Sequence, residues 1–210
     1  MRLYDYAPSA NGYKIRLLLS WLDKSYELVP VDIFSGESHT DDFLRHKNPH
    51  GRIPVLEPEP GRFLAESNAI ILFLAEGTPL LPEDRFERAH VHQWLFFEQN
   101  ALEPNLGTAR FWKLTGRAAL NPEAFRLRLE AARNALQAME RHLAHHPFFV
   151  GERPTVADIG LYGFGHVAAD AGINLGDFPA VSAWLARMKA IPGHIGALAP
   201  YTANAHVTPS

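Results

Sequence analysis

The sequence predicts an α/β domain followed by an all-helical domain, and two observations support this prediction. Short β-prone runs alternate with helical patterns up to residue 77, whereas strand patterns nearly vanish after residue 85. Between them, the segment GTPLLPEDR interrupts the periodicity with two prolines, a glycine and charges, as interdomain linkers do. We therefore expect one domain over residues 1–77 and a second over residues 86–210.

The first domain is expected to alternate strands and helices. Apolar, β-branched runs predict the strands, and apolar residues at spacings of three and four predict the helices. The expected strands are Leu3–Tyr6, Tyr26–Val31, Val55–Glu57 and Arg62–Leu64. The expected helices are Tyr13–Leu22, Thr40–His46 and Ser67–Glu76.

The second domain shows helical periodicity alone. The expected helices are Phe86–Lys113, Pro122–His145, Thr155–Ala169, Phe178–Ala190 and a short Pro192–Ala197. Thr155 and Asp158 fit a capping box with Asp in the usual Glu or Gln place, so we assign Asp158 to folding and not to proton transfer. The tail from Pro200 to Ser210 is expected to be loosely held.

Composition limits the classes of function. With 47% hydrophobic and 20% charged residues, the 210-residue chain is typical of a soluble globular protein. A net charge of −3 with interspersed signs gives no footprint for nucleic acid. The sequence shows no apolar run that could span a bilayer and no signal peptide, so we expect a cytoplasmic protein with no membrane partner. Because cysteine is absent, any thiol chemistry must use a thiol brought by the substrate.

Histidines at the end of one expected helix invite a metal hypothesis. His142 and His146 share a helix face, with His145 beside them. Pro147 ends that helix at once, histidines near a helix C-terminus complement its dipole, and no carboxylate or cysteine completes a ligand set. We expect no metal site.

Residues 48–69, NPHGRIPVLEPEPGRFLAESNA, combine a proline in a β-prone run with an acidic pair before a helix. Pro54 lacks an N–H, and a cis Ile53–Pro54 bond would turn the Ile53 backbone outward, where it could pair with an extended peptide. The helix N-terminus could hold a carboxylate, and Glu66 an ammonium group. The pattern favours a small peptide with an α-amino acid head, although a strand, a turn and a helix capped by Ser67 account for it without a ligand.

Ser9 lies in the loop between the first strand and the first helix. A hydroxyl there can donate to an anion that also feels the helix dipole, as thiolates at helix N-termini do. Lowering a thiol pKa by about two units needs roughly 2.7 kcal/mol, and a hydrogen bond to a charged group contributes about 1.5 to 3 kcal/mol. One serine aided by the dipole is enough, while a plain N-cap serine is the alternative.

Together, these segments and the later TVADIGLYG segment resemble the cytosolic glutathione S-transferase family over nearly the whole chain. Ser9, Asn11 and the YKIR segment are similar to serine-type bacterial and theta-like members. The resemblance implies a thioredoxin-like, glutathione-binding first domain and an all-helical second domain that contributes the acceptor-substrate pocket. This combination is the glutathione transferase fold.

The resemblance also implies roles for individual residues. Ser9 would hydrogen-bond the glutathione sulfur, with Asn11 and then Tyr6 as alternative donors. Ile53 would pair with the cysteinyl backbone, Glu66 and Ser67 would hold the γ-glutamyl group, and His39 and Arg52 would meet the glycyl end. The implied glutathione-binding residues are His39, Arg52, Ile53, Pro54 (with a cis bond), Glu66 and Ser67.

Other implied residues belong to the acceptor pocket and to a dimer. The pocket residues would be Tyr6, Arg110, Phe111 and Trp112, although Phe111 and Trp112 could instead be interhelical core. In related dimers a polar side chain from the helix of Glu98 and Gln99 reaches the partner's γ-glutamyl site. We therefore expect a homodimer in which one of these two residues crosses the interface.

The expected function is that of a glutathione transferase in detoxification. It would hold glutathione, its co-substrate, as a thiolate and transfer it to an electrophilic small molecule without a metal or tightly bound cofactor. A glutathione-dependent disulfide or peroxide reductase on the same fold is an alternative that Asn11 favours. A non-catalytic binding or scaffold protein is a third. A scaffold has no need of a thiol-facing hydroxyl such as that of Ser9.

Overall fold

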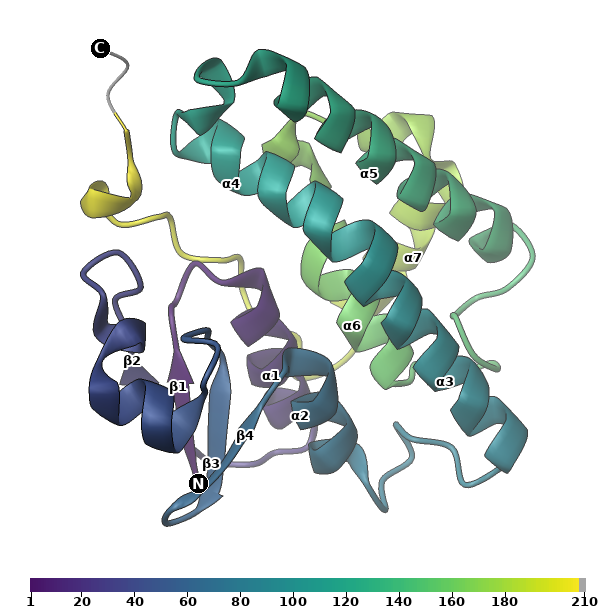
Figure 1. Cartoon of the computed structure of the whole chain (residues 1–210). Helices are drawn as coiled ribbons and strands as arrows, with labels where there is room; N and C mark the ends of the chain where they lie inside the picture. Colours follow the sequence, from purple (N-terminus) through teal and green to yellow (C-terminus); the bar gives the residue numbers. More distant parts are fainter. Residues whose placement is uncertain (208–210) are drawn as a thin grey trace. The chain divides into compact units, whose positions relative to one another are not determined.

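The structure is a computed structural model that describes residues 1–207 and divides the chain into two compact units (Figure 1). Unit 1 comprises Met1–Glu76 and Pro192–Pro200, and unit 2 comprises Gly77–Ile191 and the described residues from Tyr201 onward. Residues 192–200, which we expected within the second domain over 86–210, thus belong to unit 1. The Tyr13 hydroxyl donates to the Ile195 carbonyl at 3.0 Å and holds residues 192–200 in unit 1.

Unit 1 contains a four-stranded mixed sheet in the order β2-β1-β3-β4. β1 is parallel to β2 and antiparallel to β3, which is antiparallel to β4. Its longer elements are β1 (Arg2–Asp5), α1 (Ala10–Trp21), β2 (Glu27–Pro30), β3 (Val55–Glu59), β4 (Arg62–Ala65) and α2 (Ser67–Ala75).

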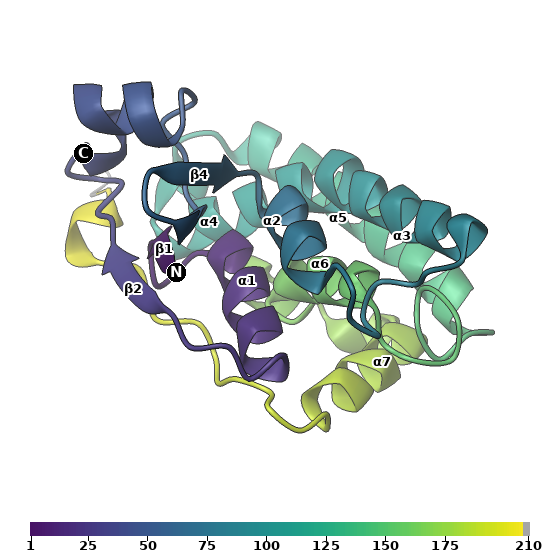
Figure 2. The same ribbon diagram turned by 90° about the horizontal axis from the view of Figure 1, so that it is seen from below.

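Helical segments lie on both faces of this sheet. On one face, the π-helical segment η2 (Phe43–Lys47) inserts Phe43 into a cluster with Val31 and Val55, on the opposite side of the strands from α1 (Figure 2). The helix expected over Thr40–His46 is therefore present, but most of it is the π-helical segment η2, and a short 3-10 turn, η1 (Glu37–His39), precedes it. The Asn48 N–H bonds the Phe43 carbonyl at 2.9 Å, which closes the wider turn of a π-helix.

Unit 2 is all-helical, and its first three segments run on as one rod beside α5 (Figure 1). Pro104 lies inside the middle segment, which is π-helical. The helix expected over Phe86–Lys113 is therefore present but π-helical in its middle, because proline cannot supply the N–H of an α-helical bond. The segments are α3 (Arg85–Phe97), η3 (Glu98–Gly107), α4 (Thr108–Leu114), η4 (Arg117–Ala119), α5 (Pro122–Leu143), α6 (Val156–Gly165), η5 (Ala168–Ala171), η6 (Leu175–Asp177), α7 (Pro179–Lys189) and η7 (Ala203–Ala205).

The expected capping box at Thr155 is confirmed. The Asp158 carboxylate accepts from the backbone N–H groups of Thr155 at 2.9 Å and Phe149 at 3.1 Å, and from the Trp184 indole at 3.0 Å. Burial raises the pKa of Asp158 to about 6, and these hydrogen bonds oppose that rise. Asp158 thus ties the buried helix α6 to its surroundings, which is a folding role.

The tail expected to be loosely held is attached to unit 2 over residues 201–207. The Val207 N–H bonds the Thr115 carbonyl at 3.0 Å, and Arg117 donates to the Ala205 carbonyl. The expectation is wrong for this segment, because the Thr115 carbonyl after α4 and the Arg117 side chain of η4 form hydrogen bonds with it. Residues 208–210 lie outside the described chain.

The fold class itself, an α/β thioredoxin-like unit followed by a helical unit, is confirmed. Over the described residues, none of the helices has the length and apolar character needed to cross a membrane.

Candidate functional site

Three loops of unit 1 meet at one end of its sheet. Tyr4 of β1 lies opposite Val55 of β3, and Val55 lies opposite Ala65 of β4. Because both pairings are antiparallel, β1 and β4 end where β3 begins. The segments that carry Ser9, Ile53 and Ser67 therefore leave the sheet at the same end, although they are distant in sequence.

Ser9 is the N-cap of α1. Its Oγ accepts a hydrogen bond from the Gly12 N–H at 3.1 Å. A serine hydroxyl has one donor and two acceptor positions, so this capping bond leaves the O–H free to donate. Within the described chain, that O–H has no acceptor. The two sequence interpretations of Ser9, helix cap and anion donor, are thus compatible.

A largely buried ion pair supports the Ser9 loop. Arg16 pairs with Asp5 and donates to the Ala7 carbonyl at 2.9 Å. Burial raises the pKa of the Asp5 carboxyl to about 7, and the Arg16 guanidinium opposes this rise. Sequence reasoning missed this pair. The available signal was Asp5, an acidic residue at the end of a strand, on the same face as the apolar Leu3.

The Ile53–Pro54 bond is cis, as expected. The Ile53 side chain packs against the cluster around Phe43, and no hydrogen bond within the described chain uses its backbone N–H or C=O. Nearby, a Cβ built on Gly51 would stand 2.9 Å from His39 Nε2, so His39 lies against the segment that leads to Arg52. The side chains of His39 and Arg52 are both exposed.

Glu66 and Ser67 start α2 in an unusual backbone conformation. Glu66 has a φ of 68°, a region that residues other than glycine rarely adopt and that is often found at ligand sites. Its side chain is exposed. The Ser67 hydroxyl is buried, donates to Asn11 Oδ1 at 3.2 Å, and accepts from Lys14 Nζ at 3.2 Å. The structure thus joins two predicted site residues and adds Lys14, which sequence reasoning missed.

Among the residues predicted for the acceptor pocket in unit 2, Arg110 and Phe111 contact other residues of the same unit. Arg110 is buried and pairs with Asp170 at 2.9 Å. The Phe111 ring meets the Tyr201 ring edge-on at 5.6 Å, in keeping with the core interpretation of Phe111. Trp112 is half-buried. In unit 1, the Tyr6 ring is buried edge-on against Phe34.

The two residues predicted to cross a dimer interface differ in exposure. Glu98 is fully buried within unit 2, whereas Gln99 is exposed. Of the pair, Gln99 has its side chain at the surface of the chain.

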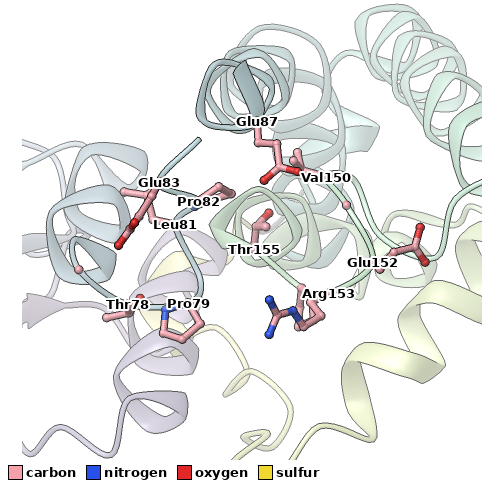
Figure 3. Close-up of a pocket in the computed structure, with 13 residues that line it drawn as sticks. Thr78, Pro79, Leu81, Pro82, Glu83, Glu87, Val150, Glu152, Arg153 and Thr155 are labelled. Carbon is pink, nitrogen blue, oxygen red and sulfur yellow. The ribbon is translucent and has the colours of Figure 1, made fainter. Parts of the chain in front are cut away.

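Unit 2 also carries a cavity of about 510 Å³ between the segment before α3 and the loop before α6 (Figure 3). Its charged lining residues are Glu83, Glu87, Glu152 and Arg153, all exposed, and the Arg153 guanidinium extends toward Pro79 (Figure 3). None of the residues that the sequence singles out for glutathione lines it. No group of three or more His, Asp or Glu side chains in residues 1–207 is placed to hold a metal ion.

Comparison with known proteins decides the family. Residues 1–76 match the family model of the glutathione S-transferase N-terminal domain, and residues 122–187 match that of the C-terminal domain. The chain is 32% identical over 194 residues to the disulfide-bond oxidoreductase YfcG of Escherichia coli, covering 89% of each protein. The chain belongs to the glutathione S-transferase family.

Solved structures of glutathione S-transferases resemble it closely. A possible glutathione S-transferase from Rhodopseudomonas palustris is 50% identical and superposes with a TM-score of 0.89, over 93% of this chain and 88% of the other. A family member from Pseudomonas fluorescens, solved with two glutathione bound, is 28% identical with a TM-score of 0.79, over 91% and 89% of the two chains.

The contact between Asp5 and Gly12 gives a stability prediction for this glutathione S-transferase. By helix propensity alone, Gly12→Ala should stabilise α1 by about 1 kcal/mol. A Cβ there would lie 1.9 Å from Asp5 Oδ1, however, so we expect a loss of about 1 to 3 kcal/mol or more. Urea unfolding measures the change. Gly196→Ala, where the added Cβ meets no atom within 4 Å, is the control. Wild-type stability of the Gly12→Ala protein would contradict the contact.

Proposed function

We propose that this protein is an enzyme that binds glutathione at the end of the unit 1 sheet and holds its sulfur as a thiolate with Ser9. The observation that carries the proposal is the spare O–H of Ser9 at the start of α1. The same end of the sheet carries the open backbone of Ile53 and the Glu66-Ser67 pair. A donor for sulfur therefore lies near groups suited to a peptide.

Each part of glutathione finds a chemically matched group in this arrangement. The Ile53 backbone, beside Pro54, pairs with the cysteinyl residue as an added strand does. The exposed Glu66 carboxylate holds the γ-glutamyl ammonium group, and the backbone N–H groups at Ser67 and the N-terminus of α2 hold its carboxylate. His39 and Arg52 supply positive charge or hydrogen bonds at the glycyl end.

The chemistry then needs little from the protein. The glutathione thiol loses its proton to solvent, and the sulfur attacks an electrophilic carbon. A leaving group then departs with its bonding electrons or, in an isothiocyanate, the nitrogen receives the electrons of its double bond to carbon and takes up a proton from solvent. Ser9 and the α1 dipole make the thiolate available at neutral pH. Serine as the sulfur donor makes this a serine-type member. Because the chain has no cysteine, the reacting thiol comes from glutathione, and the reducing cytoplasm keeps that thiol reduced. We therefore propose a cytoplasmic location.

The role of Ser9 is tested by replacing its hydroxyl. Ser9→Ala should raise the thiol pKa of bound glutathione by about one to two units, because it removes one hydrogen bond to a charged group. Titration of thiolate absorbance in the complex measures the shift. Ser9→Thr keeps both hydroxyl and cap and should keep the wild-type curve. An unchanged curve for Ser9→Ala, with a shifted one for Asn11→Ala or Tyr6→Phe, would move the role to that residue.

A glutathione-dependent disulfide or peroxide reductase is the second candidate. It is favoured by the 32% identity to a disulfide-bond oxidoreductase and by the related structure with two glutathione bound. In that reaction one glutathione thiolate attacks a substrate sulfur or oxygen, and a second attacks the resulting adduct. Two thiols become glutathione disulfide, and their two electrons reduce the substrate.

A panel of substrates separates the candidates. The proposed transferase should conjugate glutathione to chloronitrobenzene or an isothiocyanate faster than it reduces cumene hydroperoxide or hydroxyethyl disulfide. The opposite order would establish the reductase. Glutathione binding in calorimetry without turnover of any of the four compounds would point to the third alternative, a non-catalytic binding or scaffold protein.

We also propose a homodimer that uses α3. This helix exposes two large aromatic side chains, Phe86 at 72% and Phe96 at 73% of their surface, and Gln99 follows just after it. Exposed aromatics beside a polar group suit an isologous interface with an apolar centre. Because Glu98 is buried, Gln99 is the residue proposed to reach the partner's γ-glutamyl site.

Sedimentation tests the dimer. At micromolar concentration the protein should show about twice the chain mass of 23.5 kDa, and Phe96→Glu should shift it toward the monomer. Leu120→Glu, which alters another exposed apolar residue outside α3, should remain dimeric. In mixed dimers, Gln99→Ala in one chain should weaken glutathione binding in the other. A wild-type monomer with full activity would end the proposal.

A further inference from the structure

We propose that Lys14 is a positioning residue, which sets the Asn11 side-chain amide toward the sulfur of glutathione by acting through Ser67. The inference rests on the proposed function and deepens it. The hydrogen bonds through Lys14 and Ser67 connect the end of the site that holds the γ-glutamyl group with the end that holds the thiol.

Lys14 is an unusual residue to find inside a small domain. Its exposed fraction is 0%, although lysine is almost never fully buried unless its ammonium group has partners. It lies on α1 between Tyr13 and Ile15, both buried, and its ammonium group reaches the first turn of α2. There it donates to Ser67 Oγ at 3.2 Å and to Asn68 Oδ1 at 3.4 Å. The buried ammonium group thus donates hydrogen bonds to the first two residues of α2.

The direction of these hydrogen bonds follows from the chemistry of lysine. An ammonium group can only donate, so Ser67 Oγ accepts from Lys14 and its own hydrogen is free for another partner. That hydrogen goes to Asn11 Oδ1 at 3.2 Å. With its oxygen turned to Ser67, the Asn11 amide presents its Nδ2–H groups on the other side. Those N–H groups have no acceptor within the described chain.

Asn11 stands two residues after Ser9, in the first turn of α1. An amide N–H there is a second donor for an anion that Ser9 holds, and two donors lower a thiol pKa further than one. Without Lys14, the Ser67 hydroxyl could turn and the Asn11 amide could flip, which would present an acceptor oxygen to the thiolate. Lys14 thereby excludes the repulsive orientation.

The test compares Lys14→Met with Lys24→Met, which changes an exposed lysine of the same unit. Lys14→Met should raise the thiol pKa of bound glutathione by about half a unit to one unit and weaken glutathione binding about tenfold. Lys24→Met should change neither. Lys14→Gln, whose amide can still donate to Ser67, should keep most of the wild-type thiol pKa. If Lys14→Met does not fold, Ser67→Ala takes its place; it removes the hydroxyl that links Lys14 to Asn11 and should raise the thiol pKa in the same way, and an unchanged pKa would overturn the proposal.

A merely structural role is distinguished by a double-mutant cycle. In an Asn11→Ala background, Lys14→Met should no longer shift the thiol pKa, because the amide it orients is gone. Equal shifts in both backgrounds, or a lowered melting temperature with an unchanged pKa, would overturn the proposal.

A second readout does not depend on glutathione. In the ligand-free protein, the side-chain amide resonances of Asn11 should move in Lys14→Met and stay in place in Lys24→Met. Unmoved resonances would overturn the role of Lys14. A wild-type protein that fails to bind glutathione would instead remove the proposed function, and the Asn11 resonances would still decide whether Lys14 positions this amide.

Discussion

The antiparallel pairing of β3 with both of its neighbours is the constraint on which the candidate site depends. Since Val55 faces Tyr4 on one side and Ala65 on the other, the chain ends of β1 and β4 meet the beginning of β3. A slip of one residue in either pairing would exchange the side chains on the two faces of the strand, both of which are buried. Burial of Leu3, Val55 and Leu56 thus fixes the register, and the register brings the three loops together.

Buried polar groups then set the detail of each loop. Asp5 and Arg16 hold the segment before α1, while Lys14 and Ser67 join the starts of α1 and α2. Removing such groups from water is costly unless they find partners, so each one fixes the geometry of the groups that satisfy it. The apolar core decides where the site forms, and this polar layer decides which way its donors point.

The sequence predicted what depends on local pattern. The strands, the cis bond before Pro54 and the Thr155 capping box each have a signature within a few residues. The π-helical stretch around Pro104 was missed because apolar periodicity continues through the proline. Lys14 was missed for a different reason, since its partner Ser67 is 53 residues away and nothing in a single sequence reports that contact. Likewise, the sequence did not decide which of Glu98 and Gln99 crosses a dimer interface, because only the packing of unit 2 shows that Glu98 is buried.

The membership of residues 192–200 in unit 1 has a consequence for how this protein can be divided. The chain passes between the units after Glu76, again after Ile191 and once more after Pro200. Unit 1 is therefore discontinuous in sequence, and the Tyr13 and Ser20 hydroxyls of its α1 donate hydrogen bonds to the carbonyls of Ile195 and Gly193, which are encoded far downstream. A recombination event at residue 76 would carry over an incomplete module. Exchange between relatives would preserve both units only if it also brought the matching downstream segment.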